Sequence, residues 1–172
     1  MIDLQPTLVG PRVTIRPIAA ADWPEMFAAA QDPAIWELHP APDRYLEAKF
    51  RGYFEDALAC GSAFTFIDRQ SGAIIGSSRY NDHDPVAREI EIGWTFLTRA
   101  YWGGSYNAEI KTLMLEHAFR FVDTVVFWVA ENNLRSRRAM EKIGGIPRPG
   151  DWSRDVGGGR QPYLVYAIAK PG

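Results

Sequence analysis

Residues 89–121 join a hydrophobic strand, a glycine turn and an amphipathic helix, an order that can bind pyrophosphate. The turn spans residues 101–107 and contains adjacent glycines, Gly103 and Gly104. A helix start has unpaired backbone N–H groups and partial positive charge, and glycines let a bulky anion come close to the chain. The turn has neither the Lys-Ser or Lys-Thr pair of a Walker loop nor three spaced glycines. An ordinary strand-to-helix turn therefore stays open as the alternative.

A second segment, residues 126–145, places polar side chains where the next strand runs into a helix. Asn133 is a residue type that caps helices, and Ser136 follows in the first turn. Arg135 and Arg138 lie on the same helix, and guanidinium groups suit phosphate oxygens. The two segments together favour a phosphorylated ligand, with one arginine contact to phosphate and the other arginines on a solvated helix face.

Composition indicates one globular domain over residues 1–172, with 47% hydrophobic and 23% charged residues. The 19 basic and 21 acidic residues give a net charge of −2, which argues against nucleic acid as a partner. Cys60 is the only cysteine, which excludes an internal disulfide and suits the cytoplasm. The N-terminus lacks signal-peptide features and no stretch is apolar enough for a bilayer, so we expect neither secretion nor a membrane partner.

Apolar periodicity and turn residues predict the elements that position these segments. Strands are expected at residues 12–18, 63–68, 73–80, 89–97, 124–129, near 146, and at 163–169. Helices are expected from residue 22, over 45–59, after the glycines, and over 134–143. Loops are expected at 37–43 and 81–85, and a polar loop is expected through 157–159.

The second segment also carries a recognisable pattern, Asn-x-x-Ser followed by Glu-Lys-x-Gly. Placed after strand, glycine turn, helix and strand, this pattern resembles the GNAT superfamily of acyl-coenzyme A N-acyltransferases, and within it the branch with ribosomal-protein N-terminal acetyltransferases. The resemblance covers nearly the whole chain. It implies an α+β fold with a mixed, mostly antiparallel twisted sheet of about six or seven strands and about four flanking helices. The strands at 89–97 and 124–129 would splay to admit the coenzyme.

In that family the pyrophosphate of acetyl-coenzyme A sits on the glycine turn, and its pantetheine arm pairs with the preceding strand. The resemblance implies that the coenzyme-binding residues are Trp94, Thr95, Phe96, Leu97, Tyr101, Trp102, Gly103, Gly104, Ser105, Tyr106, Asn107, Asn133, Arg135, Ser136 and Arg138. A strand bulge near Phe96 and Leu97 would present N–H groups to the thioester oxygen. The glycines after Arg99 are shifted from the usual family spacing.

The resemblance implies that Glu91 and Ser136 are catalytic. Glu91 matches a carboxylate that several relatives use as a base, and the alternative is a strand carboxylate that faces solvent or an arginine. Met140 stands where many members have a tyrosine that protonates the departing thiolate, which leaves Ser136 or water for that role. Amine attack on a thioester needs a deprotonated amine, correct orientation and a stabilised oxyanion, without a covalent enzyme intermediate.

Two loops would select the acceptor amine. Trp36 and His39 lie in the loop that overhangs the acceptor pocket in relatives, and Trp152 begins the loop on the other side. We also consider a homodimer, because exposed aromatic residues such as Trp36 and Trp152 would mark a dimer surface. His83 lies between two aspartates, but three adjacent residues cannot all face one ion, so no metal is expected.

The sequence therefore predicts an acetyl-coenzyme A dependent N-acetyltransferase that acts on a small-molecule amine or a protein N-terminus. The alternative is a non-catalytic relative that binds acyl-coenzyme A as a sensor. A serine hydrolase with Ser105 as nucleophile fails, because Asn107 replaces the final glycine of the elbow and His117 lies on the same helix.

Overall fold

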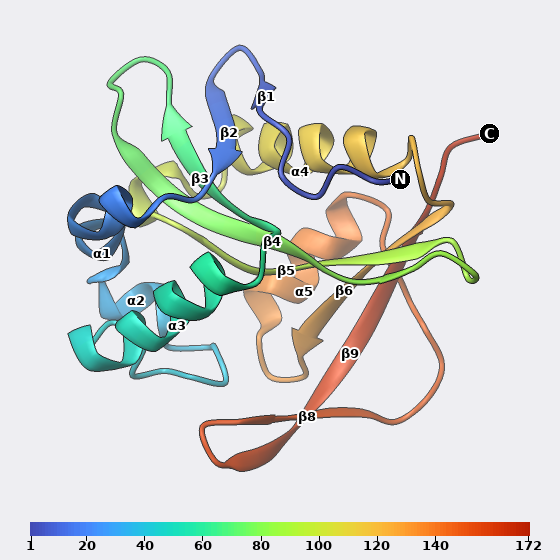
Figure 1. Ribbon diagram of the computed structural model, residues 1–172. Helices are drawn as coiled ribbons and strands as arrows, with labels where there is room; N and C mark the ends of the chain where they lie inside the picture. Colours follow the sequence, from blue (N-terminus) through green and yellow to red (C-terminus); the bar gives the residue numbers. More distant parts are fainter.

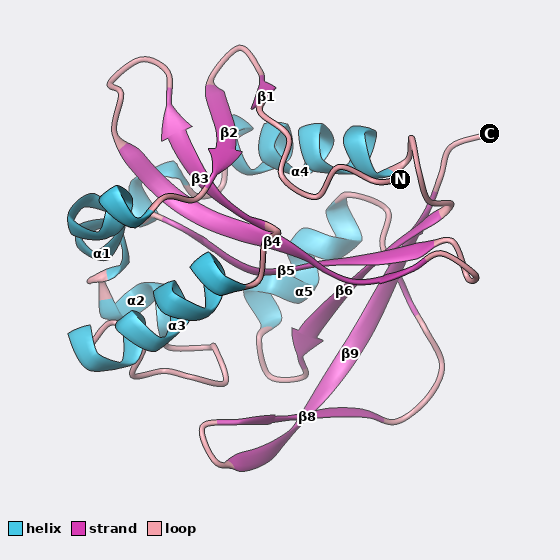
Figure 2. Cartoon of the chain, viewed as in Figure 1, coloured by secondary structure: helices cyan, strands magenta, loops and turns pink.

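The computed structural model describes residues 1–172 as one nine-stranded sheet with helices on both faces (Figures 1 and 2). The strands are β1 (Leu8–Val9), β2 (Val13–Pro17), β3 (Ala63–Asp68), β4 (Ile74–Asp84), β5 (Glu89–Leu97), β6 (Thr124–Ala130), β7 (Ile146–Pro147), β8 (Trp152–Val156) and β9 (Gly159–Ala169). The helices are α1 (Trp23–Ala30), α2 (Pro33–Trp36), α3 (Glu47–Ala59), α4 (Ser105–Ala118) and α5 (Leu134–Lys142), with 3-10 turns η1 (Ala20–Asp22) and η2 (Arg99–Tyr101). No helix has the length and apolar character needed to cross a membrane.

The sheet order is β1-β2-β3-β4-β5-β6-β9-β7, with β8 paired to β9 outside this path. Every pairing is antiparallel except β5 with β6. The expected α+β class and mixed, mostly antiparallel sheet are therefore confirmed. The numbers of strands and helices exceed the expected ones, because short β1 and β8 and the single-turn helix α2 carry weak periodicity.

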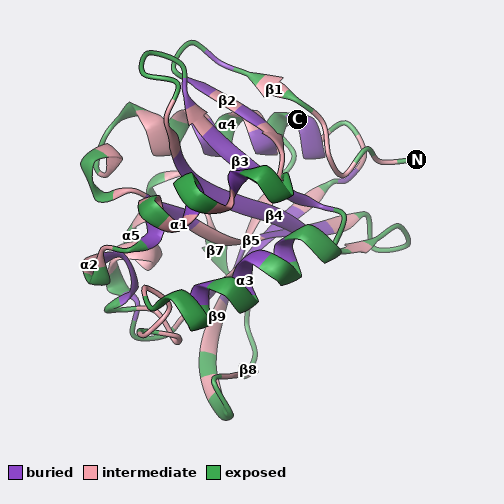
Figure 3. Ribbon diagram, turned by 60° about the vertical axis from the view of Figure 1, so that its left-hand side comes forward, coloured by how far each residue is buried: buried purple, intermediate pink, exposed green.

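Two apolar clusters fill the two faces of the sheet. The larger one packs α4 and α5 against β2 to β6 and β9, and the smaller one packs α1, α2 and α3 on the other face. Strand β5 serves both, because Ile90 and Ile92 belong to the larger cluster and Phe96 to the smaller. Figure 3 shows the central strands buried while the outer surfaces of α1 and α3 remain exposed.

Strands β5 and β6 pair only at their beginnings, where Glu89–Glu91 lie beside Thr124–Val126. Beyond Glu91 the two strands diverge (Figure 1), so the splay expected from the sequence is confirmed. The bulge expected near Phe96 and Leu97 lies earlier, at Trp94, whose φ is 53°. The register with β4 places Arg79 opposite Gly93 and Ser77 opposite Phe96, so two residues of β5 face one of β4.

Strands extend into or up to two of the expected loops. Residues 81–84 continue β4, with a register shift at Asp82 (φ 46°), and the turn follows at residues 85–88. Asp84 Oδ1 accepts the N–H groups of Val86 and Ala87 and fixes this turn. The expected polar loop around 157–159 is the tip of the β8–β9 hairpin, which projects beyond the sheet (Figure 1). Its polar strands pair by backbone hydrogen bonds, which the hydrophobic pattern does not reveal.

Candidate active site

The glycine turn ends in a helix start with no side-chain cap. Gly103 has φ of 68°, a conformation that glycine adopts without strain, and Gly104 is the extended N-cap residue of α4. No side chain accepts the N–H groups of the first turn of α4. Those groups, including the one of Ser105, are available to a phosphate.

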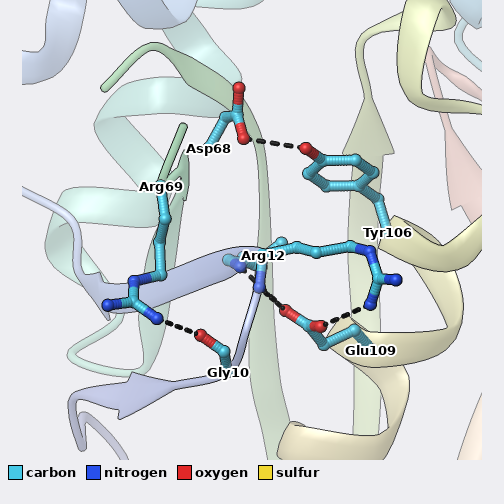
Figure 4. Close-up of polar contacts among 7 residues, drawn as sticks. Gly10, Arg12, Asp68, Arg69, Tyr106 and Glu109 are labelled. Atoms are coloured by element: carbon cyan, nitrogen blue, oxygen red, sulfur yellow. Dashed lines mark hydrogen bonds and ion pairs between the residues drawn. The ribbon is translucent and has the colours of Figure 1, made fainter. Parts of the chain in front are cut away.

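Polar contacts fix the start of α4 against the edge of the sheet (Figure 4). Glu109 Oε2 accepts the backbone N–H groups of Arg12, at 2.9 Å, and Val13, at 2.7 Å. A Cβ atom at Gly10 would lie 2.6 Å from the same oxygen, so a larger residue there would displace the Glu109 carboxylate. The first two turns of α4 are thereby held rigidly.

Three aromatic side chains of the turn point back into the protein. Tyr106 and Tyr101 donate hydrogen bonds to Asp68 at 2.9 and 3.3 Å, and Trp102 Nε1 donates to Leu97 O at 2.7 Å. Hydrogen bonds from Ser71, Tyr106 and Tyr101 hold the pKa of Asp68 below its usual value despite desolvation. The side chains of Tyr101, Trp102 and Tyr106 therefore position the turn, and their hydrogen-bonding groups are already used within the protein.

On α5, Asn133 is 7% exposed and its Oδ1 accepts the N–H group of Ser136 at 3.2 Å, so it caps the helix as the sequence predicts. The Ser136 hydroxyl makes no hydrogen bond within the chain. Arg135 stacks on Trp102, 4.0 Å from the ring centre, and donates to a carbonyl of α2. It therefore ties α5 to the glycine turn, while Arg138 is exposed on the outer surface of α5.

Lys111 of α4 lies between the splayed strands and was not identified from the sequence. Its Nζ is 3.4 Å from Thr95 Oγ1 of β5 and 5.1 Å from the Phe127 ring centre of β6. Both contacts lie beyond the last paired residues of these strands. The side chain is 5% exposed and has no carboxylate partner, and burial lowers the pKa of Lys111 to about 8.

Glu91 is the last residue of β5 that pairs with β6, and it is 1% exposed. Arg154 of β8 forks onto it with two hydrogen bonds of 2.8 Å, and Asn81 Nδ2 donates to Oε2 at 2.9 Å. Arg154 in turn stacks on Trp128 of β6 at 3.8 Å. The Glu91 carboxylate therefore faces an arginine and not solvent, and its catalytic role stays a prediction. That arginine lies in the hairpin that was expected to be a loop.

Of the three residues expected to bind the acceptor, Trp36 is buried, whereas His39 and Trp152 are half-buried. Trp36 is 1% exposed and donates to Ala30 O, so it belongs to the smaller apolar cluster and marks no dimer surface. The centre of its ring lies 5.4 Å from the Arg44 guanidinium carbon and 5.4 Å from the centre of the His39 ring. Trp152 is half-buried, packs edge-on against Trp128 and donates to a backbone carbonyl.

His39 holds the loop between α2 and α3 in its neutral form. Its Nδ1 accepts the N–H group of Ala41 at 3.0 Å, and burial, aided by the charge of Arg44, lowers the pKa of His39 to about 3. Because the folded-state pKa of His39 lies below the ordinary histidine value of 6.5, the stability contributed by neutral His39 is present above pH 6.5 and is lost as pH falls toward 3.

We therefore expect wild-type protein to lose up to about 2 kcal/mol more unfolding free energy than His39→Asn between pH 6.5 and about pH 5. Asparagine keeps an acceptor for Ala41 N–H but cannot take up a proton. Urea unfolding at the two pH values measures the difference, with His83→Asn in the β4–β5 hairpin as the control. Equal acid sensitivity of wild type and His39→Asn would contradict the neutral, buried assignment.

A family model described as an acetyltransferase (GNAT) domain matches residues 12–146. A GCN5-related N-acetyltransferase from Brucella melitensis has a TM-score of 0.85 at 20% identity, over 96% of this chain and 79% of the other. A Vibrio cholerae protein assigned as a ribosomal-protein-serine acetyltransferase has a TM-score of 0.77 at 15% identity, over 99% and 100%.

A third similar structure is the microcin C7 self-immunity acetyltransferase MccE in complex with acetyl-CoA and AMP. Its TM-score is 0.78 at 13% identity, over 98% of this chain and 99% of the other. No curated protein sequence matches the chain. At these identities the three structures are similar to this chain in fold.

Proposed function

Because this chain belongs to the GNAT acetyltransferase family, we propose that it moves the acetyl group of acetyl-coenzyme A directly to a primary amine in a ternary complex. The observation that carries the proposal is that β5 and β6 part at Glu91, whose carboxylate is buried, while the α4 helix that follows β5 starts without a side-chain cap. The coenzyme, when bound, supplies an acetyl group already activated as a thioester. MccE, a protein of similar fold, has been observed with acetyl-CoA.

The coenzyme fits donors that this chain leaves free. The N–H groups of residues 105–107 would hold the pyrophosphate. On β5, Trp94 O accepts a hydrogen bond from Tyr53 Oη, and Leu97 O accepts one from Trp102 Nε1. The backbone between these two carbonyls has no β6 partner and would pair with the pantetheine amides. The free hydroxyl of Ser136 would donate to the thioester end.

Glu91 would accept the proton of the attacking amine, directly or through water. Its Oε2 accepts from Arg154 and Asn81, whereas Oε1 accepts from Arg154 alone. A carboxylate oxygen can accept two hydrogen bonds, so one site on Oε1 stays open. A Cβ atom at Gly93 would lie 3.2 Å from Oε1, so glycine keeps this side uncrowded. The fork from Arg154 orients the carboxylate toward the splay.

Lys111 would hold the proton for the departing sulfur, because Met140 cannot. Its Nζ lies between β5 and β6, where the thioester end would reach. With a pKa of about 8, the Lys111 ammonium stays charged at neutral pH. A donor pKa close to that of a thiol, about 8.5, suits proton transfer to a thiolate.

Replacing Lys111 with Met is expected to stabilise the fold while lowering activity. Burial lowers the pKa of Lys111 from 10.5 to about 8, which corresponds to a cost of about 3 kcal/mol in the free energy of unfolding at neutral pH. Methionine does not carry this cost. Without the Lys111 proton, kcat should fall by about 100-fold. Urea unfolding and thiol release measure the two effects. A stabilised variant with wild-type kcat would remove Lys111 from the reaction and leave it a structural residue.

The proposed function is tested by thiol release from acetyl-coenzyme A in the presence of a panel of primary amines. Transfer is expected for at least one amine, with the acetylated product detected by mass spectrometry. Thermal stabilisation by coenzyme A is measured in parallel. Stabilisation with no acetylated product from any small amine or peptide N-terminus would support the non-catalytic binder instead.

A further inference from the structure

Two arginines around the Tyr53 ring, Arg79 of β4 and Arg44 of the loop before α3, have no ion-pair partner. Arg79 is 7% exposed, and its guanidinium makes no hydrogen bond or ion pair within the chain. Tyr166 Oη is the only fully buried side-chain polar atom that lacks a partner, so the Arg79 nitrogens reach solvent. Arg44 likewise has no hydrogen-bond or ion-pair partner for its side chain, and it is half-buried.

The two guanidinium groups face one aromatic ring. Arg79 lies 5.6 Å and Arg44 lies 5.2 Å from the centre of the Tyr53 ring. The guanidinium carbons of Arg79 and Arg154 also lie 4.6 and 5.4 Å from the centre of the Trp94 ring. Stacking orients these groups but does not neutralise them. Burial lowers the pKa of Arg44, and the charge of Arg79 acts in the same direction.

The charges around Glu91 do not balance. Arg154 is neutralised by Glu91 and lies 3.8 Å from the exposed Asp82, while Asp43, next to Arg44 in the chain, lies 3.7 Å from Lys49. No carboxylate is therefore paired with Arg79 or Arg44 in this partly desolvated site. Two like charges around one aromatic ring in a partly desolvated site are unfavourable until an anion binds to them. Arginine forks bind carboxylate and phosphate oxygens in pairs.

The position of the pair assigns this anion to the acceptor. Arg79 faces Gly93 across the β4–β5 register, at the Glu91 end of the splay and away from the uncapped start of α4. Arg44 also lines a cavity of about 470 Å³ between residues 40–44 and the β8–β9 tip. That volume suits a small molecule.

We propose that the acceptor is a small primary amine that carries a carboxylate or phosphate, and that Arg79 and Arg44 bind this anionic group. The inference rests on the proposed function, because it names the molecule that receives the acetyl group. The arginines would also lower the pKa of the bound ammonium, which favours the neutral amine that attacks. Glu91 would then receive the proton at Oε1.

The first experiment measures binding without turnover. Protein saturated with coenzyme A is titrated with β-alanine and O-phosphoethanolamine, and with their neutral counterparts β-alaninamide and ethanolamine, at matched ionic strength. At least one acidic amine should raise the melting temperature, and Arg79→Gln and Arg44→Gln should each weaken that binding about 10- to 100-fold. Coenzyme A affinity should not change in either variant. Arg120→Gln, at an exposed arginine at the end of α4, makes the same charge change and should have no effect.

The second experiment compares kcat/KM for the same amine pairs, expressed per concentration of neutral amine because the amides are less basic. Acidic amines should be preferred by at least about tenfold, and both variants should remove the preference through KM. A preference for carboxylates or for phosphates identifies the anion. Transfer to neutral amines at equal or higher rates would overturn the inference and leave the proposed function intact. Failure of coenzyme A to bind wild-type protein would overturn the proposed function itself.

Discussion

Glu91→Gln is expected to lower kcat by about 100-fold at neutral pH while leaving the affinity for coenzyme A unchanged. Glutamine has the size of glutamate and can still accept from Arg154, so the 1% exposed site should keep its shape. It cannot take a proton from the amine. Thiol release gives kcat, and calorimetry gives the coenzyme affinity of the same preparation.

The control lies two residues away on the same strand. Glu89 is also held by an arginine fork, from Arg148 at 3.0 and 2.6 Å, but it lies where β5 and β6 are paired. Glu89→Gln removes one charge and weakens one fork in the same manner, yet it should leave kcat unchanged. Equal activity of both variants with wild type would exclude Glu91 as the proton acceptor, and equal losses would indicate a structural effect of the forks.

Gly76→Ala is expected to destabilise the fold by about 2–3 kcal/mol. An added Cβ atom would lie 2.2 Å from Phe96 O and 3.2 Å from Leu97 Cα. Both are backbone atoms of β5, so the strand itself must move. Because that segment is the one that would pair with the coenzyme, coenzyme A affinity should fall as well.

Urea unfolding measures the first effect and calorimetry the second. Gly52→Ala provides the matched control, because a Cβ atom there meets nothing within 4 Å. Gly52 lies in the interior of α3, where alanine should stabilise by up to about 1 kcal/mol. A Gly76→Ala variant as stable as wild type would mean that β4 and β5 are further apart than described.

Local periodicity was sufficient to predict the elements that build the coenzyme side. The strand at Glu89–Leu97 has the predicted bounds, and Asn133 caps the predicted helix. Both features depend on residues close together in sequence. The bulge at Trp94 could not be placed, because it depends on the register with β4 and on hydrogen bonds between Ser78, Gly93 and Thr95.

The acceptor side depends on contacts between segments that are distant in the sequence, so most of its residues could not be predicted from local patterns. Arg154 reaches Glu91 only because a polar hairpin folds across β6, and alternation of apolar residues gives no signal there. Arg79 of β4 and Lys111 of α4 lie among buried residues, and hydrophobic periodicity assigns no role to a charged residue at such a position. A charged residue flanked by core positions is the signal that could have identified both.

The central claim is that coenzyme A binds through the free N–H groups at the start of α4, and calorimetry on two variants of Ser105 tests it. Proline is tolerated at the first helical position, and Gly104 already has the extended backbone that precedes proline. Ser105→Pro therefore removes one N–H group without disrupting α4, while Ser105→Ala keeps it. We predict that Ser105→Pro weakens coenzyme A binding about 10- to 100-fold and that Ser105→Ala binds like wild type. Equal binding by both variants, or no binding by wild type, would contradict the account.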